Sequence, residues 1–236
     1  MPVLFPGGPF LGRMESMVSK VKVISFDAEG TVVTTQFSTL IWYEAIPMQY
    51  ARQRGIEVDE ARKQIESRYS AMGMQRVEWY DVRYWFEQFS LTDYRSVLDA
   101  YRHAVGLYPE TEETLASLAR DFPLVVASAS SRDFLELLLA PIQGHFRRVF
   151  SCISDYQLLK TADFYRLVCD SLGVSPEEIV HIGDNWNGDY LAPREIGMRA
   201  FFLDRTGERV GEDVVRSLTE FQRVMATEVG GNGPIH

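Results

Sequence analysis

The sequence predicts an α/β fold, in which a doubly wound, mostly parallel sheet carries a block of helices inserted after its first strand. Three observations support this prediction. Short and almost uninterrupted apolar runs of strand length recur along the chain, and such runs suit a parallel sheet that is covered on both faces. Amphipathic helical patterns separate the later runs. A long stretch after the first run contains helical patterns alone.

Four apolar runs are predicted to be strands. All four are bounded by polar or turn-forming residues and have the length of a buried strand rather than of a helix. They are VKVISF (21–26), LVVAS (124–128), EIVHIG (178–183) and RAFFL (199–203).

Helices are predicted between the later strands, over residues 111–122, 131–141 and 162–173. The first has its apolar residues on one face, as expected of a helix that covers a sheet. Gly173 is typical of the residue that ends a helix. The SPEE sequence at 175–178 has the Ser, Pro and Glu that favour the start of a helical turn.

The stretch from residue 37 to 106 breaks the alternation of strands and helices. It contains no good strand pattern, and Pro47 is expected to kink or interrupt its first helix. The four helical patterns cover residues 40–55, 59–72, 79–89 and 93–105. We expect this block to be a helical cap domain that lies over the site, excludes water and selects the substrate.

These patterns divide the chain into four parts. Residues 1–19 are expected to be an N-terminal extension and residues 229–236 a flexible tail. The core domain is expected to comprise residues 20–36 and 107–228, and the cap domain residues 37–106.

Composition and charge narrow the classes of function. A net charge of −9 over 236 residues argues against a nucleic-acid-binding protein, which usually has a basic face. Only two cysteines occur, which favours a reducing compartment over a disulfide framework. No apolar run approaches the roughly 20 residues that span a bilayer, and the N-terminus lacks the basic start of a signal peptide. We therefore expect a cytoplasmic monomer or homodimer without nucleic-acid or membrane partners.

Polar side chains follow the predicted strands at the points where the strands end. Ligands of a doubly wound sheet bind at the carboxyl ends of its strands, so these side chains are expected to converge. The set comprises Asp27 and Glu29 after the first strand, Ser128 after the second, Lys160 before a helix, and Asp184 and Asp189 after the third predicted strand.

The chemistry of this set is coherent. Several carboxylates repel one another unless a cation lies among them, and Mg²⁺ is the hard cation that best suits oxygen ligands and a phosphorylated substrate. One carboxylate can attack the substrate and a second can transfer a proton. The lysine and the serine hydroxyl can hold phosphoryl oxygens and the attacking carboxylate.

At the level of motifs, the chain resembles the haloacid dehalogenase (HAD) superfamily. The sequence FDAEGT (26–31) is similar to its first motif, DxDxT, and GDNWNGD (183–189) is similar to its fourth. Ser128 and Lys160 match the second and third motifs in order and spacing, and LYPETEETLASL (107–118) resembles a subfamily with a helical cap between motifs one and two. The resemblance covers about residues 20–205, and four motifs in order are far more specific than any one of them.

The resemblance implies a Mg²⁺-dependent phosphatase that hydrolyses a small phosphomonoester. Asp27 would be the nucleophile that forms an aspartyl-phosphate. Glu29 would occupy the position of the general acid and base, with its backbone carbonyl on the metal. Lys160 would stabilise Asp27 and the transferred phosphoryl group. These three residues are the expected catalytic residues.

The resemblance also implies binding roles. Thr31, Ser128 and the Ala129 amide would contact the phosphoryl group or the nucleophile. Asp184 would bind the metal together with Asp27 and Glu29, and Asp189 would lie in its outer shell. Thr31 has a competing interpretation of equal weight, which is a hydrogen bond within the turn.

Three positions depart from the family pattern. Glu29 stands where the usual residue is Asp, one methylene shorter. Lys160 is followed by TAD rather than the usual PDP. Ser130 is a rival to Ser128 for the phosphate contact.

Other functions remain open on the sequence. A metal-independent 2-haloacid dehalogenase often has DAYGT where this chain has DAEGT (27–31), but such an enzyme would need neither Glu29 nor the complete fourth motif. The change from Asp to Glu could instead mark a weakly active or non-catalytic binding protein. A phosphomutase with the same core is a further alternative.

Several other residues have plainer interpretations. His181 is expected to be a satisfied core histidine rather than a catalytic one. Arg76 and Arg83 could meet a second anionic group of the substrate, although a solvated surface is the commoner place for such arginines. Most of the aromatic residues of the insertion are expected to form its core, with a minority facing the site. They are Trp42, Tyr43, Tyr50, Trp79, Tyr80, Tyr84 and Trp85.

Overall fold

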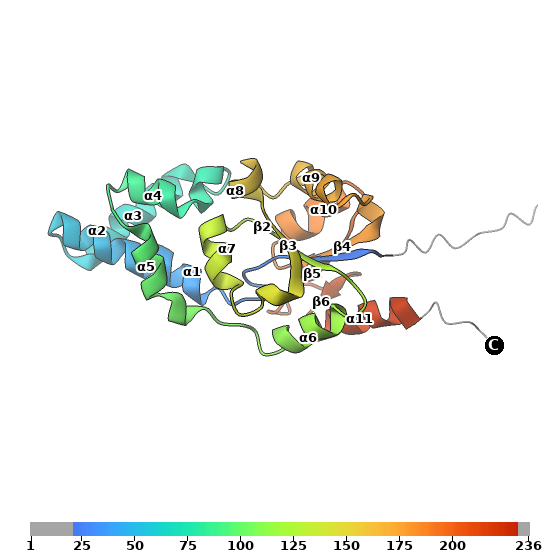
Figure 1. Ribbon diagram of the computed structural model, residues 1–236. Helices are drawn as coiled ribbons and strands as arrows, with labels where there is room; N and C mark the ends of the chain where they lie inside the picture. Colours follow the sequence, from blue (N-terminus) through green and yellow to red (C-terminus); the bar gives the residue numbers. More distant parts are fainter. Residues whose placement is uncertain (1–20, 231–236) are drawn as a thin grey trace, which may run out of the picture.

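The computed structural model describes residues 21–230, which form a six-stranded sheet with helices on both faces (Figure 1). The strand order is β3-β2-β1-β4-β5-β6, and every neighbouring pair is parallel. The strands are β1 (Val23–Phe26), β2 (Leu124–Ser128), β3 (Phe146–Ser151), β4 (Ile179–Gly183), β5 (Arg199–Leu203) and β6 (Val214–Val215). The predicted fold class is confirmed.

The central strands are the ones that the sequence identifies. All residues of β1, β2 and β4 are buried, which explains their uninterrupted apolar character. Two strands lack that signal. The edge strand β3 carries the exposed Arg147 and Arg148 in its first half, and β6 has only two residues.

Core helices cover the two faces of the sheet. Ile24 and Phe26 of β1 pack in one apolar cluster with α6, α7 and α11, whereas Val23 packs in a second cluster with α8 and α9. The alternation of side chains along β1 therefore separates the two layers. The helices are α6 (Thr111–Leu118), α7 (Arg132–Leu138), α8 (Cys152–Tyr156), α9 (Ala162–Leu172), α10 (Ala192–Arg194) and α11 (Leu218–Gly230).

The predicted core helices are present but shorter than their patterns. Gly173 follows α9 in a left-handed conformation, as its position predicts. The SPEE sequence forms the expected capping box between Ser175 and Glu178, but only a 3₁₀ turn follows, because β4 begins at Ile179.

All elements from residue 36 to 104, within the described part of the chain, are helical. Figure 1 shows α2 to α5 gathered at the opposite end of the molecule from α11. The elements are α1 (Gln36–Leu40), a π-helical segment (Ile41–Ala45), α2 (Ile46–Arg54), α3 (Val58–Met72), a 3₁₀ turn (Val77–Tyr80), α4 (Val82–Gln88), α5 (Tyr94–Ala100) and a 3₁₀ turn (Arg102–Ala104). We call them the insertion.

Pro47 does not break the first helical stretch. It lies in the first turn of α2, where its missing N–H is tolerated, and the irregularity takes the form of the π-helical segment before it.

The predicted terminal parts lie mostly outside the described residues. Residues 1–19 are outside them entirely, and of the predicted tail only its first two residues fall within α11. None of the helices in residues 21–230 combines the length and hydropathy needed to cross a bilayer.

Candidate active site

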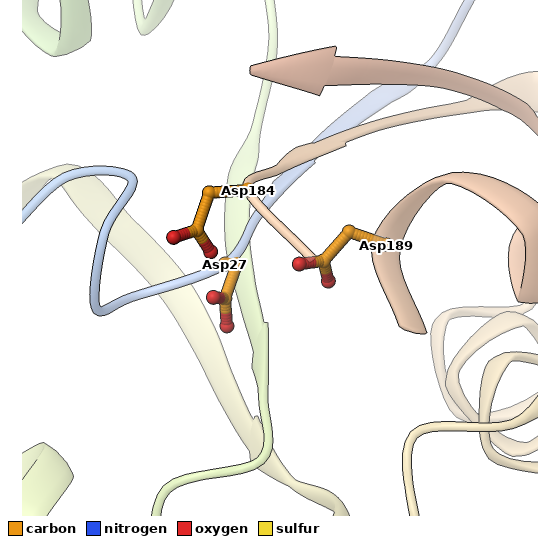
Figure 2. A group of neighbouring side chains, drawn as sticks. All are labelled: Asp27, Asp184 and Asp189. Atoms are coloured by element: carbon orange, nitrogen blue, oxygen red, sulfur yellow. The ribbon is translucent and has the colours of Figure 1, made fainter. Parts of the chain in front are cut away.

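Three aspartates meet at the carboxyl ends of the central strands. Asp27 follows β1, Asp184 follows β4, and Asp189 lies on a π-helical segment, Trp186–Leu191. Figure 2 shows their carboxylates close to one another, and one oxygen from each lies within 4.8 Å of the others. The adjacency of β1 and β4 in the sheet brings them together.

Lys160 lies between two of these acids. Its Nζ pairs with Asp27 Oδ1 at 2.7 Å and, more closely still, with Asp189 Oδ1. The Lys160 side chain is only 8% exposed. It enters from the loop that precedes α9, two residues before the helix begins.

The buried charges of Lys160, Asp189 and Asp27 shift one another's pKa values. Burial opposes charge on Lys160, but the carboxylates of Asp189 and Asp27 outweigh it and raise the pKa of the lysine. Burial likewise opposes charge on Asp189, yet Lys160 and His181 hold the pKa of that carboxyl well below its usual range. For Asp27, burial and the charge of Asp189 prevail over Lys160 and raise its pKa. The one lysine cannot neutralise both acids.

Asp184 forms no ion pair with a lysine or arginine of residues 21–230, whereas Lys160 pairs with the other two aspartates. Although Asp184 is exposed to solvent, loss of hydration and the charges of Asp27 and Asp189 raise the pKa of its carboxyl above the usual range. Three acids around one lysine form a donor set of hard oxygens with excess negative charge. Such a set fits a divalent cation with oxygen ligands.

His181 is a satisfied buried histidine, as predicted. Its Nδ1 lies 2.9 Å from Ser25 Oγ and its Nε2 lies 3.1 Å from Asp189 Oδ1. The Tyr165 hydroxyl also approaches Asp189 and donates to the Gly188 carbonyl at 2.8 Å. Burial lowers the pKa of His181. His181 and Tyr165 therefore fix Asp189, and Tyr165 gives no signal in the sequence beyond the apolar face of its helix.

Two glycines make room for the acids. Gly30 has a φ of +75°, and a Cβ at this position would overlap the Asp184 carboxylate. A Cβ on Gly183 would overlap the Asp189 carboxylate. Both glycines stand within the first and fourth motifs, which is the signal that could have identified them.

Glu29 is held by a serine from another strand end. Ser130 Oγ donates to Glu29 Oε2 at 2.8 Å. The other oxygen, Oε1, is buried without a hydrogen-bond donor among residues 21–230, since the neighbouring Ser38 hydroxyl donates to the Thr35 carbonyl. Burial and the charge of Asp27 raise the pKa of Glu29. Ser130 therefore contacts the second acid in this structure, rather than standing free as a rival phosphate contact.

The predicted phosphoryl contacts separate into two groups. Ser128 and Ala129 line the cavity above Asp27, and Ser128 Oγ accepts from the Ser130 amide at 3.3 Å. Thr31 is fully buried and lies outside the cavity lining. Ser128 and Ala129 therefore share a cavity with the aspartates, whereas the Thr31 hydroxyl is buried outside its lining and has no hydrogen-bond partner among residues 21–230.

Arg205 fixes the backbone of the first motif. It follows β5 and donates to the carbonyls of Gly30 at 3.2 Å and Thr31 at 2.9 Å. It also pairs with Glu110 at 2.7 Å, and its guanidinium lies 3.5 Å from the centroid of the Tyr108 ring. Sequence reasoning missed Arg205, because nothing in the residues around it distinguishes this arginine from the other nineteen.

A cavity of about 850 Å³ opens above the aspartates, between the core and the insertion. Four of the seven insertion aromatics named above line it, which corrects the expectation of a minority: Trp42, Tyr43, Trp79 and Tyr80. Arg76 pairs with Glu78 at 2.7 Å and Arg83 pairs with Asp133 at 2.7 Å. Neither arginine lines the cavity, so neither is placed to meet a substrate there.

Comparison with known proteins places this geometry in context. Residues 21–197 match the family described as haloacid dehalogenase-like hydrolase. No curated protein matches the chain. Among solved structures, a HAD phosphatase from Thermococcus onnurineus is 26% identical, with a TM-score of 0.77 over 87% of this chain and 98% of that one. An L-2-haloacid dehalogenase from Xanthobacter autotrophicus, with chloropropionic acid covalently bound, is 17% identical, with a TM-score of 0.59 over 87% and 98% of the two chains.

Proposed function

This chain belongs to the haloacid dehalogenase-like hydrolases, and we propose that it is a Mg²⁺-dependent phosphatase that hydrolyses a small phosphomonoester through an aspartyl-phosphate. The observation that supports this choice is the presence of two acids with separate surroundings at the end of β1. Asp27 is paired with Lys160, whereas Glu29 is bonded to Ser130. Two carboxyl groups with different environments suit a nucleophile and a proton carrier.

The first half of the reaction uses both acids. Lys160 holds Asp27 Oδ1, so we assign Oδ2 as the atom that attacks phosphorus. A bond forms between Oδ2 and phosphorus while the bond from phosphorus to the alcohol oxygen breaks. Glu29, protonated at this stage, gives its proton to the departing oxygen.

The second half returns the enzyme to its starting state. Glu29, now a carboxylate, takes a proton from water, and the water oxygen attacks the phosphorus of the aspartyl-phosphate. The bond between Asp27 and phosphorus breaks, and inorganic phosphate leaves. The Ser128 hydroxyl and the Ala129 amide, which line the cavity, hold the phosphoryl oxygens.

Asp27, Asp184 and the Glu29 carbonyl would hold Mg²⁺, with Asp189 in the outer shell. The bound ion would neutralise charge that develops on the phosphoryl oxygens. In this proposal, helices α1 to α5 act as the cap that encloses the substrate.

A paired assay tests the function. Phenyl phosphate and a 2-chloroacid are each incubated with Mg²⁺ and with EDTA. We expect phosphate release that requires Mg²⁺ and no halide release. Halide release in EDTA would instead indicate a dehalogenase, and inactivity of the folded protein on both substrates would indicate a binding protein.

Mg²⁺ is expected to stabilise the protein, because a cation relieves repulsion among Asp27, Asp184 and Asp189. At 100 times its dissociation constant, a ligand of the folded state adds about 2.7 kcal/mol to the free energy of unfolding. Urea unfolding with and without Mg²⁺ measures this increase. Asp184→Asn should remove most of it, whereas the exposed Asp59→Asn should keep it; an equal increase in both variants would contradict the assignment.

Glu29→Asp is expected to lower kcat, even though Asp is the usual family residue. The shorter side chain withdraws from Ser130, whose Oγ lies 2.8 Å from Oε2. Glu29→Gln removes proton transfer altogether and should lower kcat by about 10²- to 10⁴-fold. The kcat of Glu29→Asp should lie between that of Glu29→Gln and that of the wild type. Steady-state phosphate release measures both, and wild-type activity in Glu29→Asp would show that the site is not adapted to the longer acid.

A further inference from the structure

The cavity above Asp27 has two walls of opposite character. All charged residues that line the cavity belong to the core. They are Lys160 and the acids Asp27, Glu29, Asp184, Asp189 and Glu195. The insertion and the adjoining Thr35 contribute only uncharged residues, which we call the insertion wall: Thr35, Ser38, Thr39, Trp42, Tyr43, Met74, Gln75, Trp79 and Tyr80. A phosphate held at Asp27 therefore leaves the rest of the substrate facing an uncharged surface.

The insertion wall exposes apolar side chains that a solvated protein surface does not require. Tyr43 is 42% exposed and Met74 is 52% exposed, and both lie in the cavity lining. Trp79 and Tyr80 lie beside each other there, with ring centroids 4.9 Å apart. Exposed apolar groups that gather in a cavity are typical of a binding surface.

The insertion wall offers no cationic partner to a second anion. No arginine lines the cavity, and the arginines of the insertion named above are paired: Arg76 donates twice to Glu78 and Arg83 donates twice to Asp133. Arg62, which donates to the Tyr43 carbonyl, is paired with Asp59. The single lining cation, Lys160, is already paired with two acids of the core. A substrate carboxylate would therefore lose its hydration without gaining a counter-charge.

We propose that the preferred substrates are phosphomonoesters of uncharged aromatic alcohols, and that the site rejects esters with a second anionic group. This inference rests on the proposed phosphatase function and adds the substrate class. The core holds the phosphate, and the rings of the insertion wall contact the aromatic group. The volume of about 850 Å³ is within the usual range of small-molecule sites.

Phosphonates test the proposed substrate class by binding alone, because their carbon–phosphorus bond is not hydrolysed and the enzyme does not turn them over. Three are compared in the presence of Mg²⁺: benzylphosphonate, 4-carboxybenzylphosphonate and 2-aminoethylphosphonate. Binding is measured by quenching of tryptophan fluorescence, since Trp42 and Trp79 line the cavity. Benzylphosphonate should bind at least about tenfold more tightly than the other two. Equal or tighter binding of either competitor would overturn the proposal.

Two matched pairs of variants test whether the insertion wall causes the preference for benzylphosphonate. Met74→Ser should weaken benzylphosphonate binding, whereas Met48→Ser, which changes a methionine of similar exposure (44%) outside the cavity, should not. Gln75→Arg should improve the binding of 4-carboxybenzylphosphonate relative to benzylphosphonate. Gln88→Arg, on the insertion but outside this cavity, should leave the ratio unchanged. No difference within either pair would place the selectivity elsewhere and overturn the assignment.

The two proposals fail in different ways. If phenyl phosphate is not hydrolysed but the phosphonates bind in the expected order, the hydrolytic function fails and the recognition of uncharged aromatic phosphoesters stands. If phenyl phosphate is hydrolysed but the phosphonates bind alike, the function stands and the substrate class fails.

Discussion

Asp27→Asn is expected to lower kcat for phenyl phosphate by about four orders of magnitude or more, because an amide oxygen cannot replace a carboxylate as the nucleophile. The substitution keeps the shape of the side chain and an acceptor for Lys160. It also removes one negative charge from a cluster in which burial and Asp189 already disfavour the ionised form of Asp27. The variant should therefore be at least as stable as the wild type.

This combination of an inactive enzyme and an undiminished free energy of unfolding makes the prediction specific. Phosphate release and urea unfolding are measured on the same preparation. Asp163→Asn, which changes an exposed aspartate at the start of α9, is the control and should alter neither quantity appreciably. Residual activity above a few per cent in Asp27→Asn would contradict the nucleophile assignment.

Lys160→Met is expected to have the largest effect on stability, with a loss of about 3–5 kcal/mol, because it leaves two buried carboxylates without their counter-charge. Lys160 Nζ contacts both Asp27 and Asp189, and the side chain is 8% exposed. Methionine has a similar length, so the change removes charge rather than volume. Activity should be lost as well, since in the proposed mechanism Lys160 also stabilises the transferred phosphoryl group.

Lys22, an ion-paired lysine of the core that is largely exposed, provides a matched control. Lys22 pairs with Glu178 at 2.6 Å, but its side chain is 55% exposed. Lys22→Met should therefore cost about 1 kcal/mol or less. Adding Asp189→Asn to Lys160→Met should recover part of the lost stability, because it removes one of the uncompensated charges. Similar losses in the two lysine variants, with no recovery in the double variant, would contradict this account.

The sequence predicted the parts of the fold and of the site that depend on local pattern. Strands β1, β2 and β4 were predictable because burial on both faces demands continuous apolar runs. Asp27 and Asp184 were predictable because each follows such a run directly. Strand β3 was not, since its position at the edge allows Arg147 and Arg148 to be exposed.

The contacts that sequence reasoning missed join residues far apart in the chain. Ser130 reaches Glu29 across 101 positions, and Arg205 reaches Thr31 across 174. Neither pairing has a periodicity or a spacing that marks it. The burial of Thr31 outside the cavity lining was likewise not predictable, because it depends on how the turn of the first motif packs against the rest of the core.

The position of β1 has a consequence for how the chain folds. Of the strands in residues 21–230, β1 is synthesised first and lies in the middle of the sheet, with Ile24 beside Leu124 on one edge and Val23 beside Ile179 on the other. Both edges of β1 therefore stay unpaired until segments made much later reach them, and the loops to be closed are long. A nascent or refolding chain thus exposes an apolar strand until most of the polypeptide is available, and that interval is when aggregation competes with folding.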